Sequence, residues 1–171
     1  MRRSQFFGHL CTVLLFLGGV GSVLQAADVA RIGVLAKRGK DRCEEMWAPT
    51  AEYLTQQVNG VTFECLPLGF DELEPAVAEG AIDFVLTNPS MYTLLNARYG
   101  INRIATLTNL GTGSRMTKEF GGVIFCRSDR ADITTADDIA GRTIGAVAAT
   151  SFGGWQVGLH ELSKAGLNER K

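Results

Sequence analysis

The sequence has 171 residues, which is room for one ordinary domain. Hydrophobic residues make up 46% and charged residues 20%, so a packed core is favoured over disorder. The formal net charge is −1 and there is no basic tail or basic helix face, so nucleic acid is not an expected partner.

The first 27 residues differ in kind from the rest of the chain. Arg2 and Arg3 precede an apolar run over about 10–24, and small residues follow at Ala26 and Ala27. This order is typical of a secretory signal, so we expect a periplasmic or other extracytoplasmic location. Because position −3 of the cleavage site is not small, residues 1–27 are interpreted as a signal peptide or, alternatively, an N-terminal membrane anchor.

Residues 28–108 alternate between strand and helix patterns and predict a first lobe. Apolar spacing at i, i+4, i+7 and i+11 marks one helix, and glycines stop each of the helices. A β-α-β-α-β-α-β order predicts a mainly parallel sheet with helices on both faces. The expected strands are 30–36, 61–66, 82–86 and 101–108, and the expected helices lie around 47–58, 71–79 and 89–99.

The chain beyond residue 108 predicts a crossing followed by the beginning of a second lobe. Residues 109–119 are rich in glycine and polar residues and are interpreted as a crossing or hinge. Over 120–171 we expect an incomplete second lobe, because some sixty residues are too few for a lobe of the first kind. Its expected elements are strands at 121–126 and 143–148 and helices at 134–140 and 151–165.

Two junctions, 86–92 and 149–155, each run from an apolar strand into a helix start rich in hydroxyls. Unpaired amides at a helix start attract anions. At the first junction, Ser90, Met91 and Tyr92 are candidate ligand residues through their amides, together with the Ser90 hydroxyl. The alternative is a plain capped helix with Asn88 as its N-cap.

The second junction offers Thr150, Ser151 and Gly153 as candidate ligand residues. A hydroxyl caps the helix, and glycines at 153 and 154 would let a ligand approach the backbone closely. Glycine in the first turns of a helix costs about 1 kcal/mol relative to alanine, so these positions need a reason. The alternative reason is close packing of the helix against a strand.

A basic loop over 37–42 is the third candidate, with Lys37 and Arg38 expected to attract an anion. The alternative is a solvated surface loop. Arg115 and Lys118 in the crossing are weaker candidates of the same kind.

Enzymatic function is not expected, and neither is a metal or other cofactor. His160 is the one histidine after the leader, so a His-rich metal site is excluded. Three cysteines follow the leader, of which Cys65 and Cys126 are interpreted as small buried hydrophobes. Cys43, placed in a charged loop, is the cysteine expected to react or pair. A small secreted enzyme with Cys43 as nucleophile is therefore a remote alternative, without an organised base.

Several short motifs, in this order and spacing, resemble the solute-binding proteins of phosphate, phosphite and phosphonate transporters. They resemble more narrowly the version of that domain found as the outer sensor of some membrane histidine kinases, including tetrathionate-type sensors. The resemblance covers about 30–166. The motifs are Arg-Ile-Gly-Val-Leu-Ala at 31–36, Trp-Ala-Pro at 47–49, the run 83–92, Phe-Gly-Gly-Val-Ile at 120–124 and Ser-Phe-Gly-Gly-Trp at 151–155.

The resemblance implies an α/β fold of the type II periplasmic-binding class, with two mainly parallel lobes that close on a ligand. It implies anion contacts at 37–42, 90–92 and 150–154. Phosphonate binders usually carry Ser-Thr-Ser at the last place, where this chain has Ala149, Thr150 and Ser151. The expected function is an extracytoplasmic sensor domain that binds a small oxyanion and signals to a membrane partner, a histidine kinase. The alternative is the substrate-binding component of a phosphate- or phosphonate-type ABC transporter.

Overall fold

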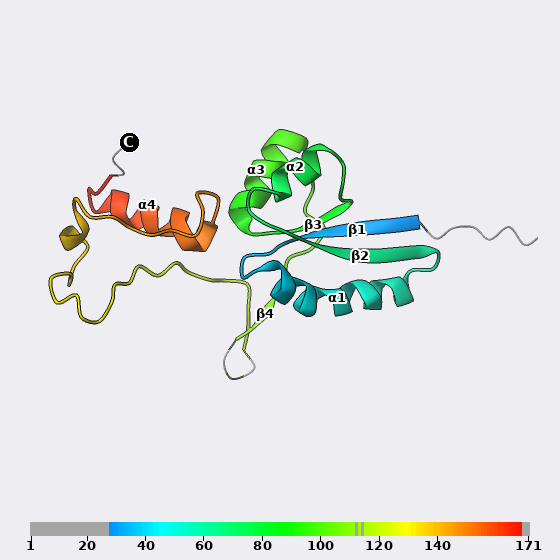
Figure 1. Ribbon diagram of the computed structural model, residues 1–171, viewed down its shortest axis with the longest axis horizontal. Coiled ribbons are helices and arrows are strands. Elements are labelled where there is room, and N and C mark those ends of the chain that lie inside the picture. The colour runs from blue at the N-terminus through cyan, green and yellow to red at the C-terminus, as the bar shows by residue number, and fades with distance from the viewer. Residues whose placement is uncertain (1–27, 112, 114, 169–171) are drawn as a thin grey trace, which may run out of the picture.

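The computed structural model describes residues 28–111, 113 and 115–168; the expected leader, 1–27, lies outside these residues. Three parallel strands form a sheet in the order β2-β1-β3 (Figure 1). They are β1 (Asp28–Leu35), β2 (Val61–Leu68) and β3 (Phe84–Leu86). Ile32 of β1 lies opposite Cys65 of β2 on one side and Phe84 of β3 on the other. The predicted parallel α/β arrangement is confirmed for this part of the chain.

Helices cover both faces of this sheet, because each parallel connection needs a crossover. Helix α1 (Lys40–Gln57) lies on one face, and α2 (Leu73–Ala78) and α3 (Pro89–Tyr99) lie on the other (Figure 1). The core forms under α2 and α3 from Leu35, Leu73, Met91 and Leu95, all buried. The helix predicted at 89–99 has these bounds in the structure and ends at Gly100 with φ +67°.

The fourth strand predicted at 101–108 does not form. Residues 101–108 are extended but join no ladder, and the side chain of Ile104 is 82% exposed. A strand is defined by hydrogen bonds to a neighbour, and an apolar, β-prone sequence does not supply that neighbour. The edge of β3 therefore has no fourth strand beside it within the described residues.

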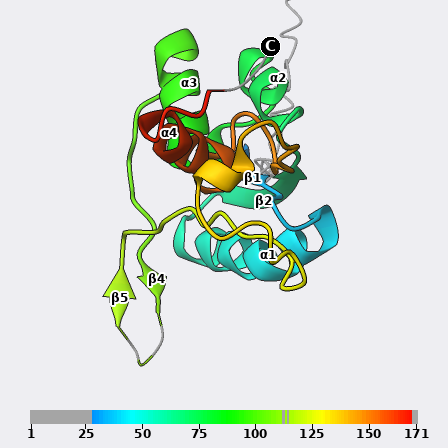
Figure 2. The same ribbon diagram turned by 90° about the vertical axis from the view of Figure 1, so that its left-hand side faces the viewer.

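The glycine-rich segment 109–119, predicted as a crossing, contains a small antiparallel hairpin. Strands β4 (Asn109–Leu110) and β5 (Met116–Thr117) pair with each other, and the hairpin projects from the body of the molecule (Figure 2). The cross-strand neighbours Leu110 and Met116 are both well exposed. The chain then runs on from Phe120 toward the C-terminal helices (Figure 1).

The C-terminal part has less regular structure than predicted. The strands expected at 121–126 and 143–148 do not form: both segments lack regular structure, and the second bends at residue 147. The short helix expected at 134–140 is a 3-10 turn, η2 (Asp137–Ile139). The last helix begins as a π-helical turn, η3 (Phe152–Gln156), and continues as α4 (Val157–Lys164). Across the described ranges, no helix combines the length and the apolar character needed to cross a bilayer.

Candidate functional site

The first candidate junction is a capped helix start directly after β3. The side chain of Asn88 accepts a hydrogen bond from the Met91 amide at 3.0 Å, and the Tyr92 amide donates to the Asn88 carbonyl at 3.0 Å. Pro89 occupies the first helical position, where its missing N–H costs nothing. Of the three amides expected to be free, only that of Ser90 has no acceptor among the described residues. The expectation that the Met91 and Tyr92 amides are free is therefore wrong, because the cap uses both.

The side chains at this junction differ in exposure. Met91 is 1% exposed and belongs to the core, so its side chain cannot reach a surface ligand without opening the core. Ser90 and Tyr92 are half-buried. What this junction offers to an anion is one amide and the hydroxyls of Ser90 and Tyr92.

The second junction has a similar cap. The Ser151 hydroxyl accepts from the Gly154 amide at 3.2 Å, and Ser151 is 8% exposed. The Trp155 and Gln156 amides both donate to the Ser151 carbonyl, which gives the turn its wide, π-helical form. The amides of Phe152 and Gly153 have no acceptor within the described part of the chain. Thr150, just before the cap, is half-buried.

Close packing explains the two glycines of this junction. A Cβ on Gly153 would come within 2.9 Å of the Phe120 ring, and one on Gly154 within 2.6 Å of a Val147 methyl group. Phe120 and Phe152 meet edge to face, with ring centroids 5.7 Å apart. Glycine is thus needed here for contact between the helix start and the extended segments beside it, the alternative that the sequence had left open.

The structure brings the two junctions into one region. Helix α3 contacts the π-helical turn η3, and Figure 1 shows these elements as neighbours. Both helices begin with amides that have no acceptor, at Ser90 and at Phe152 and Gly153. Helix starts carry partial positive charge, which favours a negatively charged group nearby.

The basic loop is shorter than predicted. Lys37 and Arg38 are exposed in a turn closed by Gly39, whose φ is +95°, and α1 begins at Lys40. Lys40 pairs with Glu72 at 2.6 Å. Glu72 also accepts from the Gly69 amide at 2.7 Å, and that bond, followed by Lys40, lowers the pKa of its carboxyl.

Lys37 and Arg38 lie at the same edge of the sheet as the first junction. Strands β1 and β3 are parallel and pair Val34 with Leu86, so the loops that follow them leave side by side. Ligands of parallel α/β sheets bind beyond these carboxyl ends. The turn at Lys37 and Arg38 and the helix start at Ser90 are therefore neighbours by topology.

The Thr87 hydroxyl was not among the predicted site groups. Its oxygen is buried and has no hydrogen-bond partner, and among the side chains that the structure describes it is the one buried polar atom in this state. Thr87 lies between β3 and the Asn88 cap. The sequence signal was a hydroxyl at a strand end directly before a capped helix.

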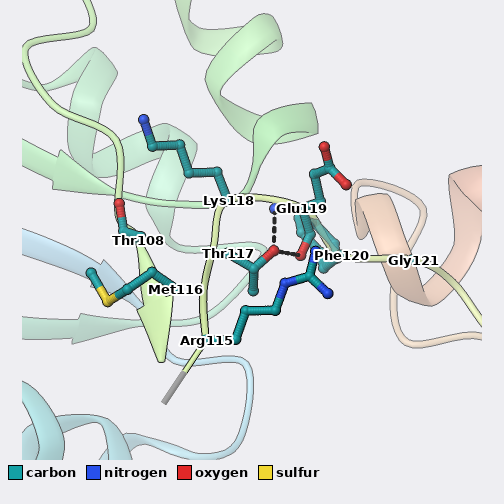
Figure 3. A pocket seen from close by; sticks show the side chains of 8 residues that line it. All are labelled: Thr108, Arg115, Met116, Thr117, Lys118, Glu119, Phe120 and Gly121. Carbon is teal, nitrogen blue, oxygen red and sulfur yellow. Dashed lines mark hydrogen bonds between the residues drawn. The ribbon is translucent and has the colours of Figure 1, made fainter. Parts of the chain in front are cut away.

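A broad, open hollow lies elsewhere, at the base of the hairpin (Figure 3). Its volume is about 850 Å³, and Arg115 and Lys118, the weaker basic candidates, line it together with Glu119. The Thr117 hydroxyl bonds to the backbone of Glu119 in its wall. None of the eight predicted site residues lines this hollow, but its wall residue Phe120 packs against Phe152 and Gly153, so the hollow adjoins the second helix start.

The cysteines differ from their predicted settings. Cys43 lies in the first turns of α1, 7% exposed, and burial first and Glu44 second raise the pKa of its thiol. Cys126, expected to be buried, is exposed, and Cys65 is intermediate. The placement of Cys43 in a charged loop is wrong, and a buried thiol with a raised pKa is a poor nucleophile.

Comparison with known proteins places this fold in a family. Residues 32–171 match the family described as the periplasmic substrate-binding protein of phosphonate ABC transporters. The chain belongs to this family. It is a solute-binding domain located outside the cytoplasm, in a family that is non-enzymatic.

One relative is a signalling protein. The chain is 37% identical over 160 residues to the tetrathionate sensor histidine kinase TtrS of Salmonella typhimurium. The match covers 92% of this chain and 27% of that protein, so the chain spans about a quarter of the relative's length. No solved structure matches the chain significantly.

Proposed function

We propose that the chain is the extracytoplasmic sensor domain of a membrane histidine kinase and that it binds a small oxyanion. Membership in a solute-binding family supports the ligand-binding role. The relative supports the signalling role, because the matched part of that protein is about a quarter of its length and the rest is available for other functions. Catalysis is not part of this role, and the chain acts by binding alone.

The observation that carries the proposal is the contact between α3 and η3. We propose that the two helix starts, whose first amides are unbonded, face one anion together with the turn that carries Lys37 and Arg38. An oxyanion there would accept hydrogen bonds from amides that have no acceptor within the described residues. Charge-assisted bonds of this kind are about twice as strong as neutral ones.

Signalling requires that the bound and free states differ. We propose two units, 28–108 and 120–171, which close on the anion about the segment 109–119, as in a type II periplasmic-binding fold. A ligand shifts such an equilibrium only by its difference in affinity for the two states. Contacts from both helix starts to one anion would supply that difference, because they form together when α3 and η3 are in contact, as they are here, and are lost when the two units separate.

Tetrathionate is the first ligand to test, because the relative is named as a tetrathionate sensor. Thiosulfate, sulfate, phosphate, phosphite and methylphosphonate complete the panel. At about 100 times its dissociation constant, a bound anion stabilises the folded chain by roughly 2.7 kcal/mol. Thermal unfolding with each anion, followed by titration calorimetry of those that raise Tm, measures this. No shift with any of these anions would contradict oxyanion binding.

A matched pair of variants separates specific contact from general charge. The double variant Lys37→Gln and Arg38→Gln removes two positive charges beside the proposed site, and we expect at least tenfold weaker binding, a loss of about 1.4 kcal/mol. The control, Arg127→Gln with Lys164→Gln, removes the same charge from exposed ion pairs of the C-terminal part. Equal losses in both doubles would show long-range attraction in place of direct contact.

A second candidate role is the substrate-binding component of an ABC transporter, favoured by the description of the matching family. The two roles differ in the membrane partner. In the full-length gene product reconstituted in vesicles, a sensor domain makes autophosphorylation depend on the anion, whereas a transporter component makes anion uptake depend on the chain. Anion-dependent uptake without any phosphorylation would favour the transporter.

A further inference from the structure

The hollow at the base of the hairpin combines charge with an aromatic wall. Its volume of about 850 Å³ lies within the range of small-molecule pockets. The charged residues that line it are Arg115, Lys118 and Glu119, and Phe120 supplies the aromatic wall (Figure 3). Two cations and one carboxylate give the lining a net positive charge, which favours an anionic occupant.

Phe120 borders both this hollow and the second helix start. A Cβ on Gly153 would lie 2.9 Å from its ring, and the ring meets that of Phe152 edge to face. Phe120 is nevertheless 53% exposed, so part of it faces the open space of the hollow. A ligand at the unbonded amides of Phe152 and Gly153 can therefore extend past Phe120 into the hollow.

Arg115 is the cation of the hollow that is best placed to meet such a ligand. Its side chain reaches toward Phe120 and Glu119, whereas that of Lys118 extends the other way (Figure 3). Arg115 is exposed and forms no ion pair with the carboxylates that the structure describes. Its guanidinium can thus exchange water for a ligand, and its planar fork of donors fits two oxygens of one oxyanion.

We propose that the hollow is a second subsite, where Arg115 binds the far end of an elongated dianion. The inference rests on the proposed function, in which the near end of the ligand lies at the helix starts. Phe120 then contacts the middle of the ligand. Sulfur and alkyl groups both pack favourably on an aromatic ring, so polythionates and alkane disulfonates fit this arrangement. Sulfate, thiosulfate and phosphate have one tetrahedral centre and fill the near subsite alone.

The test compares anions with two charged ends and anions with one. Tetrathionate and 1,3-propanedisulfonate have two, whereas thiosulfate and methanesulfonate have one. By titration calorimetry, the wild-type chain should bind one of the first pair at least about tenfold more tightly than either of the second, the gain expected from a charge-assisted bidentate contact. Arg115→Gln should abolish this advantage and keep the affinity for thiosulfate within about twofold.

Arg103→Gln is the matched control, because Arg103 is also exposed and does not line the hollow. It removes the same charge and should keep the full advantage of the two-ended anions. Glu119→Gln tests the hollow in the opposite direction. It removes the carboxylate of the lining, so two-ended anions should bind about two- to threefold more tightly, with no change for thiosulfate. Thermal unfolding of each variant checks that it folds.

Several results overturn the inference and leave the proposed function standing. One is an advantage of the two-ended anions in the wild-type chain that is smaller than about tenfold. Another is an advantage that persists in Arg115→Gln. Equal losses for both kinds of anion in that variant also overturn it, since long-range charge would then explain them. A wild-type chain that binds none of these anions overturns both the inference and the proposed function.

Discussion

Residues 28–100 and residues 101–168 are similar in apolar character but differ in how they fold. In the described part of the chain, the buried apolar side chains lie in 28–100, with Leu162 of α4 the exception. In the second region, Val123 and Phe125 are 79% and 87% exposed although they stand in an apolar run. The first region closes a sheet between two helical layers, whereas the second places extended segments beside one helix. A local pattern thus becomes regular structure only where packing partners meet it.

The largest test of this contrast is a pair of truncations. Leu95→Ala removes a fully buried side chain from α3, and we expect a loss of about 2 to 5 kcal/mol in the free energy of unfolding. Val123→Ala removes an exposed one and should stay within about 0.5 kcal/mol. Urea unfolding followed by circular dichroism at 222 nm compares them. A comparable loss in Val123→Ala would show that the second region packs against something in solution.

A second test asks whether the two regions unfold as one unit. Asn88→Ala and Ser151→Ala each remove the cap of a helix start, and each should cost about 1 kcal/mol. The two tryptophans of the sequence report separately, because Trp47 lies in α1 and Trp155 in η3. We expect Asn88→Ala to shift the Trp47 transition and Ser151→Ala to shift that of Trp155.

Single-tryptophan variants, Trp47→Phe and Trp155→Phe, provide the control for these fluorescence transitions. If either cap variant moves both transitions equally, the regions unfold together and the contrast drawn above does not extend to stability. Separate transitions would support two units joined by the hairpin segment.

Sequence reasoning predicted the first region well because its signals are local and agree with one another. Asn88, Pro89 and Gly100 specify the start and end of α3, and their roles in the structure are those predicted. The strand predictions at 101–108, 121–126 and 143–148 failed for a different reason. Composition reports that a segment can join a sheet, whereas a ladder also needs a neighbour, which is a property of the whole fold.

The candidate site was predicted in outline, and its details required coordinates. The two junctions were recognised from hydroxyls and glycines at helix starts, and the structure places their elements in contact. The Met91 and Tyr92 amides donate hydrogen bonds within the cap because of the geometry of Asn88. This geometry cannot be inferred from a sequence pattern. A role in ligand binding stays a prediction for every one of these residues.

A third test uses acid together with a variant of one carboxylate in the second region. The carboxylate of Asp138 accepts hydrogen bonds from the amides and hydroxyls of Thr134 and Thr135, which lowers its pKa from 3.8 to about 2. A depressed pKa stabilises the folded form above the unfolded value, and this contribution disappears as pH falls from about 4 toward 2. Asp138→Asn should therefore remove part of the pH dependence of Tm in that interval.

Asp137→Asn is the matched control for the acid test, because the neighbouring carboxylate makes no hydrogen bond to the described residues. It removes the same charge and should leave the slope of Tm against pH close to that of wild type. If both variants reduce the slope of Tm against pH equally between about pH 4 and 2, the change in net charge accounts for the effect. The hydrogen bonds to Thr134 and Thr135 then do not.

The smallest expected effect concerns the thiols, which follow the same division between the regions. Cys126 is exposed in the second region, whereas Cys43 is a buried residue of α1, and burial raises the pKa of its thiol. Thiolate is the reactive form, so iodoacetamide should modify Cys126 at least about tenfold faster than Cys43 at pH 8. Peptide mass spectrometry over time measures both modification rates. The variant Cys126→Ser, which should fold with unchanged Tm, lets the slower modification of Cys43 be measured alone. Equal rates at the two sites would mean that α1 opens readily, and the packing contrast between the regions would then not hold on the timescale of the reaction.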